Sequence, residues 1–283
     1  MREPSALTVV IRGAGGMATG IAIRLLRAGI SRLCLLEKPF PLSIHRLAAF
    51  AEAVLEGYAV VEGVTAALIS QPSELPALWD AGCAGLLVDP QGFWLREIRP
   101  DVIIDTTHSQ DACLSLTAAP LIIGLRPVHA PGVHAHLVIE TAGPGLGRVL
   151  HSDSDLPRAG LAGHMSGFGA FIVHAPHGGV FRTQRDIGEY VESGESVGSL
   201  AEPGTLKACG EAVRAPVSGI LRGLLRDYAE VERHARLAYI DPREDVVCHQ
   251  LSDRVLAVGG GVLEAVLGAL RTRPQPRAGI LTL

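Results

Sequence analysis

The chain of 283 residues has few aromatic side chains, almost no lysine and no excess of positive charge. Aromatic residues make up 4% of the sequence and the formal net charge is −4. Proteins that bind nucleic acids use basic surfaces and aromatic side chains on which bases stack, so this composition argues against that class. The two lysines, Lys38 and Lys207, are the only candidates for a covalently modified amine.

Long apolar segments and paired cysteines are lacking as well. The most apolar stretch, 255–270, contains Glu264 and is shorter than the roughly 18 apolar residues that cross a bilayer. Segment 6–11 is followed by Arg12 and a glycine turn, which is typical of a first strand rather than of a signal peptide. The five cysteines are scattered without a C-x-x-C motif, so we expect reduced thiols, a cytoplasmic location and no membrane association.

The first half of the chain alternates short apolar runs with segments of helical periodicity. Residues 7–12 form such a run, a glycine turn and an apolar-periodic helix follow, and a second run ends at Glu37. The spacing predicts another amphipathic helix over 43–56. Further apolar runs lie at 66–70, 84–89, 101–105 and 121–125. Strands that alternate with helices predict a doubly wound parallel sheet of the Rossmann-like kind.

An internal repeat dominates the second half. Residues 173–200 and 213–240, offset by 40 without a gap, are identical at seven of 28 positions, whereas composition alone predicts roughly two. Two copies of one small β-unit are therefore expected, related by a pseudo-twofold axis. This arrangement resembles the barrel-sandwich hybrid of biotinyl and lipoyl domains, in which a hairpin between the halves carries a modified lysine. Here that hairpin spans 201–212 and contains Lys207, but its flanks differ from those of carrier domains, so we expect no biotin or lipoate on Lys207.

These patterns predict an α/β protein with a Rossmann-like doubly wound parallel sheet and a small all-β barrel-sandwich hybrid. The polar, glycine-rich stretch 151–169 marks the boundary between them. The expected parts are a dinucleotide-binding-type domain at 1–155, the barrel-sandwich hybrid at 170–245, and a C-terminal helical segment at 246–283 that packs back on the first domain.

The glycine turn after the first strand matches the dinucleotide-binding fingerprint G-x-G-x-x-[GA], with Gly13, Gly15 and Ala18 at its defined positions and Gly16 within it. Glycines let a pyrophosphate approach the backbone N–H groups at the start of the helix. Glu37, 24 residues after Gly13, stands where an acid would bind a ribose 2′-hydroxyl and disfavour NADP. The motif favours a site for NAD or another nucleotide, and the alternative is a turn that serves only helix–strand packing.

Four other features are candidates for chemistry. Asp105 ends a predicted strand, where doubly wound sheets place ligands, although it also suits a helix N-cap. Cys248, beside a histidine and charged residues, is a candidate nucleophile or sulfur carrier, or else a small buried side chain. His134 and His136 would face one side of a strand but lack a clear third metal ligand, so no metal site is expected. Gly259–Gly261 could begin an anion-binding helix or form a tight packing turn.

Several phrases occur in an order that resembles the bacterial selenium-dependent molybdenum hydroxylase accessory (maturation) family. They are IRGAGGMATGIAIRLLRAG, EKPFPLSIHRLAAFAEAV, APLIIGL, IETAGPGLGRVL, YIDPR and SDRVLAVGGGVLEAVL. The chain departs from that family where Gly16 replaces a usual aspartate and where Tyr228 and His234 replace glycines. The resemblance implies assistance in assembling the cofactor of a xanthine-dehydrogenase-type hydroxylase, a hydroxylase subunit as partner, and a nucleotide, a pterin or the molybdenum cofactor as ligand.

Three functional classes stay open on the sequence. The first is a maturation factor for a selenium-dependent molybdenum hydroxylase, with or without catalytic activity of its own. The second is an NAD-dependent oxidoreductase, although no hydride-transfer base stands at a recognisable spacing. The third is a carrier module that uses Lys207. A homo-oligomer is compatible with each of them.

Overall fold

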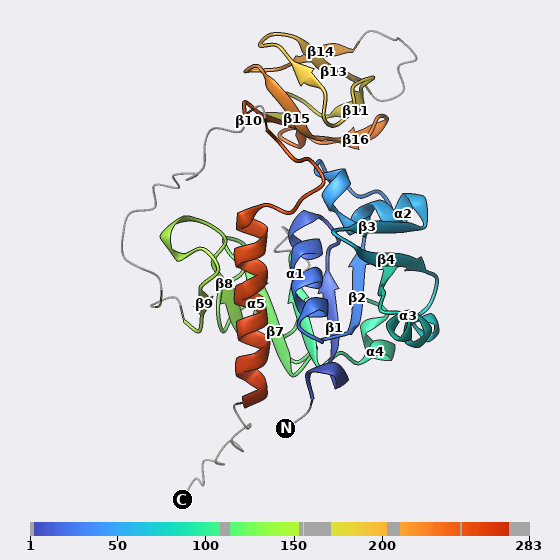
Figure 1. Ribbon diagram of the computed structural model, residues 1–283, viewed down its shortest axis with the longest axis vertical. Coiled ribbons are helices and arrows are strands. Elements are labelled where there is room, and N and C mark those ends of the chain that lie inside the picture. Colours follow the sequence, from blue (N-terminus) through green and yellow to red (C-terminus); the bar gives the residue numbers. More distant parts are fainter. Residues whose placement is uncertain are drawn as a thin grey trace, which may run out of the picture.

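The computed structural model describes residues 3–107, 114–152, 155, 171–202, 210–243 and 245–271. Within these residues the chain forms two parts (Figure 1). The first is a nine-stranded sheet with helices packed against it, and the second, drawn in yellow and orange, consists of two four-stranded sheets. The long helix α5 (Asp253–Arg271) follows the second part and packs against the first.

The nine strands of the first part lie in the order β3-β4-β5-β2-β1-β6-β7-β8-β9. They are β1 (Thr8–Arg12), β2 (Arg32–Glu37), β3 (Tyr58–Val61), β4 (Val64–Ile69), β5 (Ala84–Val88), β6 (Val102–Asp105), β7 (Leu121–Leu125), β8 (Leu137–Ile139) and β9 (Val149–Leu150). Strands β1, β2, β5, β6 and β7 are buried along nearly their whole length and pair in parallel, as expected for strands covered on both faces.

Both edges of this sheet depart from the parallel arrangement expected from the sequence. Strands β3 and β4 form an antiparallel hairpin, and β9 runs antiparallel to β8. The hairpin turns at Glu62 and Gly63, which both have positive φ (47° and 80°), the conformation that tight two-residue hairpins require. The sheet is therefore mixed, and the expectation of a purely parallel, doubly wound sheet is wrong.

Helices α1 (Gly16–Arg27) and α5 pack on one face of the sheet, and α3 (Leu75–Asp80) packs on the other. Glycines bring α1 and α5 close together, because a Cβ at Gly20 would overlap Val255 and a Cβ at Gly259 would overlap Arg24. Residues 259–261 thus lie inside α5 and form neither an anion-binding helix start nor a turn; Gly259 packs on α1, and Gly261 packs on the carbonyl oxygen of Gly147. The remaining helical elements are short: η1 (Pro4–Ala6), η4 (Pro72–Glu74), α4 (Leu95–Ile98) and η5 (Gly143–Gly145).

Segment 43–56 is not the continuous helix that its periodicity predicts. It is divided into η2 (Arg46–Ala48), η3 (Phe50–Glu52) and α2 (Ala53–Glu56), with Ala49 extended (φ −138°, ψ 131°) between the first two. The N–H of Phe50 donates to Thr19 Oγ1 and the N–H of Ala51 donates to the carbonyl of Ala14, both at 2.8 Å. Bonds to α1 and its preceding turn therefore replace the bonds that a continuous helix would make.

The second part shows the 40-residue repeat as two sheets of matching order. Its strands are β10 (Phe171–His174), β11 (Gly179–Arg182), β12 (Tyr190–Val191), β13 (Ser196–Ala201), β14 (Glu211–Arg214), β15 (Gly219–Leu224), β16 (Ala229–Val231) and β17 (Arg236–Asp241). The sheet orders are β10-β17-β15-β12 and β14-β13-β11-β16. The strand at each position of one sheet is the repeat partner of the strand at the same position of the other sheet. Each sheet also contains strands of both halves of the repeat. Phe181, Val197, Leu221 and Leu237 fill the core between them.

These observations correct the expected fold class. The chain is a mixed α/β protein with a nine-stranded mixed sheet and two antiparallel sheets, not a parallel doubly wound sheet plus a barrel-sandwich hybrid. The hairpin tip with Lys207, on which the biotinyl and lipoyl comparison depended, lies outside the described residues. Among the residues that the structure describes, no helix has the length and apolar character needed to cross a membrane.

Candidate functional site

A small cavity lies at the carboxyl ends of β1 and β2, next to the glycine turn. Its volume is about 110 Å³. The residues that line it are Arg12, Gly13, Leu36, Glu37, Lys38, Pro90 and Thr107. Strand β2 lies on one side of β1 and β6 lies on the other. The order in which strands are added to the sheet therefore reverses at β1. Ligands of open α/β sheets bind at such a switch point, at the carboxyl ends of the strands.

The space around the glycine turn is filled at Gly13 and open at Gly15. Gly13 has φ +94°, and a Cβ there would lie 2.5 Å from Thr106 Oγ1, so only glycine fits at this position. Gly15 has an ordinary φ of −65°, and a Cβ there would meet nothing within 4 Å. Gly15 is also the N-cap of α1, whose first turn contains no acidic residue and receives no side-chain cap from it. The positive end of the α1 dipole therefore faces open space at Gly15.

Glu37 lies against the glycine turn, as the sequence motif predicts. Its Oε2 accepts a hydrogen bond from the N–H of Ala14 at 2.7 Å, and its Oε1 accepts one from the N–H of Lys38 at 2.9 Å. A carboxylate has about four lone-pair sites. Within the described residues Glu37 thus accepts two of the roughly four hydrogen bonds that its carboxylate can accept.

Gly15, Gly16 and Ala18, the other three residues of the predicted nucleotide motif, are not among the residues that line the cavity, and Gly16 and Ala18 contact other parts of the protein. Gly16 faces the carbonyl of Ala48, which would lie 3.7 Å from its Cβ. Ala18 is 1% exposed and belongs to the core of the first part. Both residues serve packing of α1 in this structure.

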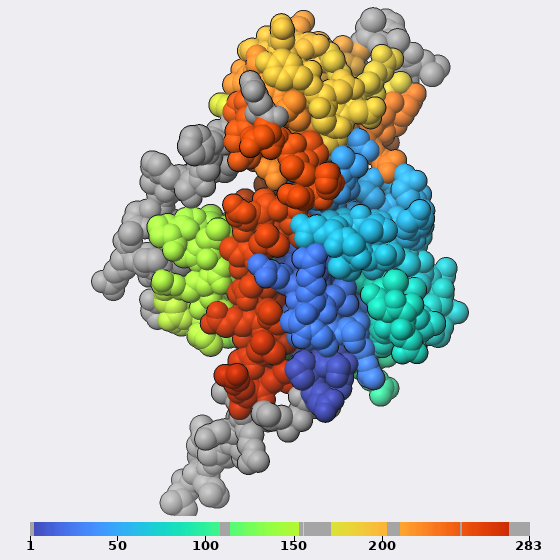
Figure 2. Space-filling model, in the orientation of Figure 1, coloured from blue at the N-terminus to red at the C-terminus, as the bar shows by residue number. Residues whose placement is uncertain are grey.

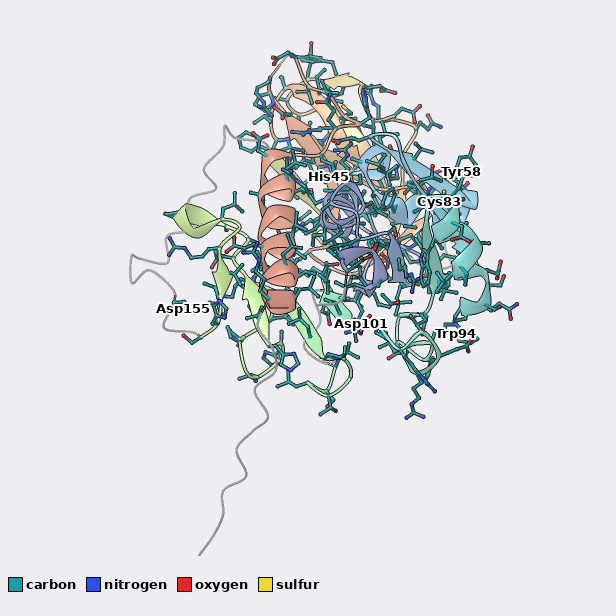
Figure 3. All side chains as sticks on the ribbon, turned by 60° about the horizontal axis from the view of Figure 1, so that its bottom comes forward. His45, Tyr58, Cys83, Trp94, Asp101 and Asp155 are labelled. Atoms are coloured by element: carbon teal, nitrogen blue, oxygen red, sulfur yellow. The ribbon has the colours of Figure 1, made fainter. Side chains whose placement is uncertain are left out.

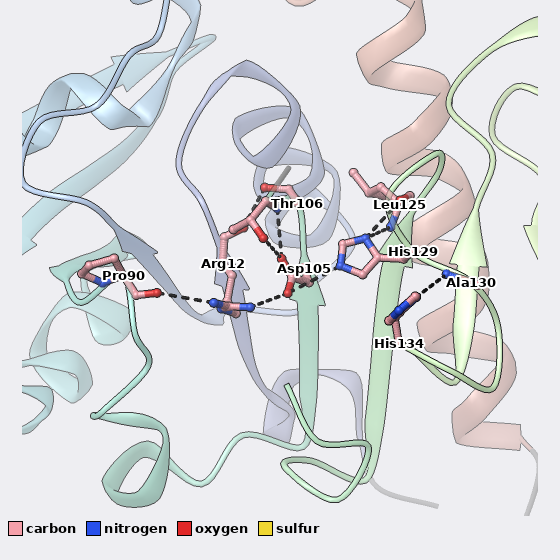
Figure 4. Close-up of polar contacts among 9 residues, drawn as sticks. Arg12, Pro90, Asp105, Thr106, Leu125, His129, Ala130 and His134 are labelled. Atoms are coloured by element: carbon pink, nitrogen blue, oxygen red, sulfur yellow. Dashed lines mark hydrogen bonds and ion pairs between the residues drawn. The ribbon is translucent and has the colours of Figure 1, made fainter. Parts of the chain in front are cut away.

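A buried ionic network adjoins the cavity, because its members Arg12 and Thr107 also line the cavity. Figure 4 shows the contacts around Asp105. Arg12 Nη1 donates to Asp105 Oδ2 at 2.5 Å, and His129 Nε2 lies 3.6 Å from the same oxygen. Thr107 donates to Asp105 Oδ1 through its hydroxyl (2.7 Å) and its N–H (3.0 Å). Arg12, Asp105 and His129 are at most 3% exposed. Both carboxylate oxygens of Asp105 thus have partners, and the side chain is buried away from solvent.

The network fixes the charges of its members. Burial alone would raise the pKa of Asp105, but His129, Arg12 and Thr107 together lower it. Burial alone would lower the pKa of His129, and the Asp105 carboxylate outweighs this and raises it. His129 Nδ1 lies 3.1 Å from the carbonyl oxygen and 3.2 Å from the N–H of Leu125, so it finds a partner with or without its own proton. His129 Nε2 faces Asp105 Oδ2 at 3.6 Å, so a protonated His129 places a positive charge beside the carboxylate.

Sequence reasoning identified Asp105 but missed Arg12 and His129. Arg12 is the last residue of a strand that is otherwise apolar and buried, so a charge there was a signal that a buried partner exists. His129 follows β7 by four residues and gives no such signal, because only the tertiary fold brings it beside β6.

The remaining candidates make other contacts, although the ring of His134 lies 6.4 Å from that of His129. Cys248 follows the second part of the chain, with its Sγ 4.0 Å from the carbonyl of Leu221, and burial raises the pKa of its thiol. His134 Nδ1 and His136 Nδ1 accept hydrogen bonds from two different backbone amides, those of Ala130 and Ile122. Among the described residues, no group of three or more His, Cys, Asp or Glu side chains could hold a metal ion. The predicted catalytic pair, Cys248 and Asp105, therefore does not form one site.

Comparison with known proteins gives one curated relative and several distant structures. No family model matches the chain. The uncharacterized protein YqeB of Escherichia coli (strain K12) is 35% identical over 263 residues, which cover 92% of this chain and 47% of that protein. The chain thus spans about half the length of its curated relative.

Among solved structures, the chain matches a succinylglutamate desuccinylase/aspartoacylase of Rhodobacter sphaeroides over 27% of its length and 23% of that chain (22% identity, TM-score 0.23). It matches the ectoine utilization protein EutE (DoeB) of Ruegeria pomeroyi over 77% of its length and 61% of that chain (10% identity, TM-score 0.24). A succinylglutamate desuccinylase of Silicibacter sp. TM1040 matches over 83% and 85% (14% identity, TM-score 0.24). TM-scores at this level do not indicate a shared fold.

These findings do not support the family and function expected from the sequence. The matches are a protein described as uncharacterized, succinylglutamate desuccinylase/aspartoacylase structures and an ectoine utilization protein. A selenium-dependent molybdenum hydroxylase maturation protein is not among them, and neither is an NAD-dependent oxidoreductase. Membership in that maturation family, the selenium-linked role and the oxidoreductase alternative are therefore corrected and not carried further. The cytoplasmic location and the expected partners stay predictions.

Proposed function

We propose that the first part of the chain binds a nucleotide at the cavity between the carboxyl ends of β1 and β2. The observation that carries this proposal is the meeting of Glu37 and Gly13 of the glycine turn at one cavity, with the open side of Gly15 two residues further along the same turn. We propose binding only and assign no reaction to the site. NAD is the ligand that the motif favours, with ATP or a pterin dinucleotide as further candidates.

The chemistry of the lining groups suits a ribose next to a phosphate. The two lone-pair sites left on Glu37 can accept hydrogen bonds from neighbouring sugar hydroxyls. The start of α1 at Gly15 offers backbone N–H groups and a positive dipole end to a phosphate. The cavity of about 110 Å³ is smaller than the roughly 300–1,000 Å³ of typical ligand pockets. It therefore accommodates one sugar or phosphate group, and the rest of the ligand would lie over Gly15.

Calorimetric titration with NAD, NADP, ATP and a pterin dinucleotide tests the proposal. At least one ligand should bind, with an unphosphorylated ribose preferred because Glu37 repels a 2′-phosphate. Gly15→Trp should abolish binding, since the indole would fill the open space, while the melting temperature changes little. Val60→Trp adds the same side chain at an exposed position of edge strand β3 and should bind like the wild type.

The variant Glu37→Gln provides a second test of the proposed nucleotide site. Loss of the negative charge should reduce the preference for NAD over NADP, and a preference that stays the same would show that Glu37 does not contact the ribose. If none of the ligands binds the wild-type protein at millimolar concentration, the glycine turn has only a structural role and the proposal is wrong.

A further inference from the structure

Segment 44–56 connects the cores of the two parts of the chain. Ile44 is 6% exposed and belongs to the hydrophobic core of the second part, although it lies far earlier in the sequence. Ala49, Phe50 and Ala51 are fully buried in the core of the first part. His45 lies where the two parts meet (Figure 3), with its ring 5.0 Å from that of Tyr239. In Figure 2 the second part sits directly on the blue surface that contains this segment.

The second part holds this segment through backbone and charged contacts. The N–H of Leu224 donates to the carbonyl of Ile44 at 2.7 Å, and Arg46 Nε donates to the carbonyl of Leu224 at 2.8 Å. Arg226, in the loop after β15, donates to Glu56 at 2.7 Å and forms a second ion pair with Glu52. Glu52 is only 15% exposed, which makes its pairing with Arg226 stronger than a surface ion pair.

The opposite side of the same segment forms the wall of the glycine turn. The N–H of Ala51 donates to the carbonyl of Ala14, and the N–H of Phe50 donates to Thr19 Oγ1. The Thr19 hydroxyl in turn donates to the carbonyls of Ala14 (3.2 Å) and Gly15 (3.0 Å). Ala14 of the glycine turn is thus hydrogen-bonded to this wall directly, and Gly15 is linked to it through the Thr19 hydroxyl.

The wall has little regular structure of its own. It consists of two single 3-10 turns joined by an extended residue and followed by the four-residue helix α2, so few internal hydrogen bonds determine its conformation. Its position therefore depends on the contacts at its two sides, with the second part above and α1 below. Removing the contacts on one side should loosen the contacts on the other.

We propose that the second part of the chain completes the ligand site of the first: Arg226 is a positioning residue that holds segment 44–56 against the glycine turn. The importance of this wall for ligand affinity rests on the proposed function. The positioning itself follows from the hydrogen bonds above and holds whether or not a nucleotide is the ligand. Ligand binding at Gly15 and docking of the second part are then coupled, so each strengthens the other.

Amide hydrogen exchange on the full chain tests the positioning without any ligand. In Arg226→Met, the amides of Phe50, Ala51 and Thr19 should exchange faster than in the wild type, while those of β11 and β15 in the core of the second part stay protected. Arg214→Met changes an exposed arginine of the same part, whose Nη1 donates to the carbonyl of Gly194, and should leave all these rates unchanged. Arg226→Lys, which keeps the charge but not the guanidinium group, should lie between the two.

Ligand titration then tests the coupling. For a ligand that binds the wild type, Arg226→Met should raise the dissociation constant about tenfold, within the usual range of coupled sites. Unchanged exchange at Phe50 and Ala51 in Arg226→Met would overturn the positioning role, even if a nucleotide binds. Faster exchange confined to the wall supports it, even if no nucleotide binds and the proposed function fails. Faster exchange throughout both parts would show general destabilisation and would also overturn it.

Discussion

Replacing Asp105 by asparagine should destabilise the protein strongly. The side chains of Asp105 and Arg12 are 3% and 4% exposed, and their charged atoms lie 2.5 Å apart. The asparagine would keep the size of the side chain but remove its charge, so the Arg12 guanidinium would stay charged in the interior without its anionic partner. The substitution therefore tests whether Asp105, a predicted catalytic residue, has a structural role.

The magnitude follows from the burial of the pair. Removing one partner of a buried ion pair typically costs about 3–5 kcal/mol. The asparagine oxygen can still accept the hydrogen bonds of Thr107, each of which contributes roughly 1 kcal/mol. We therefore expect a loss of about 1–3 kcal/mol in the free energy of unfolding at pH 7. In the double variant Arg12→Met with Asp105→Asn, no unpaired charge stays buried and at least half of the loss should be recovered.

The same network predicts how stability depends on pH. The folded-state pKa of His129 is raised, so its contribution is fully present below its unfolded pKa of about 6.5 and is lost as the pH rises through the raised value. The folded-state pKa of Asp105 is lowered, so its contribution is present above its unfolded pKa of about 3.9 and is lost as the pH falls through the lowered value. The wild type should thus lose stability above neutral pH, and His129→Gln should lose less over that range.

Equilibrium unfolding in urea, monitored by circular dichroism from pH 4 to pH 9, measures these quantities. A loss below about 1 kcal/mol for Asp105→Asn would refute the reasoning, because a buried charge pair cannot be broken so cheaply. If the wild type and His129→Gln lose the same amount of stability as the pH rises, the assignment of a raised pKa to His129 is refuted. Ligand affinity measured on folded Asp105→Asn separates a loss of stability from a loss of binding.

Two further substitutions in α5 and one at the candidate thiol give sharp expectations. A Cβ at Gly260 would meet no atom within 4 Å, so Gly260→Ala should stabilise α5 by up to about 1 kcal/mol. A Cβ at Gly261 would overlap the Gly147 carbonyl, so Gly261→Ala should cost about 1–3 kcal/mol of stability. Thermal melts of the two variants would measure both effects. Burial raises the pKa of the Cys248 thiol, so iodoacetamide should modify it more slowly at pH 7 than a free cysteine. Cys248→Ser should leave nucleotide affinity unchanged, and a large loss would contradict the separation of Cys248 from the ligand site.

Local patterns predicted the elements around the candidate site correctly. The strand at β1, the glycine turn, α1 and the end of β2 at Glu37 follow from apolar runs and from glycine spacing, which act over a few residues. The contact between Glu37 and the turn also followed from the motif. These features could be predicted because their causes lie within a short stretch of sequence.

Features that depend on distant residues were not predictable in the same way. Segment 43–56 has a helical period, but its amides bond to α1 and the turn before it, so the tertiary contacts outweigh the local preference. The β3–β4 hairpin was missed although Glu62 and Gly63 form its turn, because no typical Asn-Gly or Asp-Gly pair marks it. The pairing of His129 with Asp105 joins residues 24 positions apart in sequence, and no local signal predicts it.

The duplicated part gives a final prediction, at positions where the two halves differ in residue but not in backbone. Gly194 (φ 84°) and its repeat partner His234 (φ 69°) donate equivalent 2.8 Å hydrogen bonds, to the carbonyls of Ala215 and Ala175. The fold therefore requires a left-handed residue at both positions, and a non-glycine residue there costs about 1–2 kcal/mol. Because glycine loses about 0.5–1 kcal/mol more backbone entropy on folding, His234→Gly should stabilise the protein by about 0.5–1 kcal/mol, and Gly194→Ala should destabilise it. Tyr228, the partner of Gly188, should gain less from the same change, because its ring packs 3.7 Å from the Arg182 guanidinium. Urea unfolding of the three variants would measure this, and a destabilised His234→Gly would show that the histidine side chain makes a contact worth more than the backbone strain.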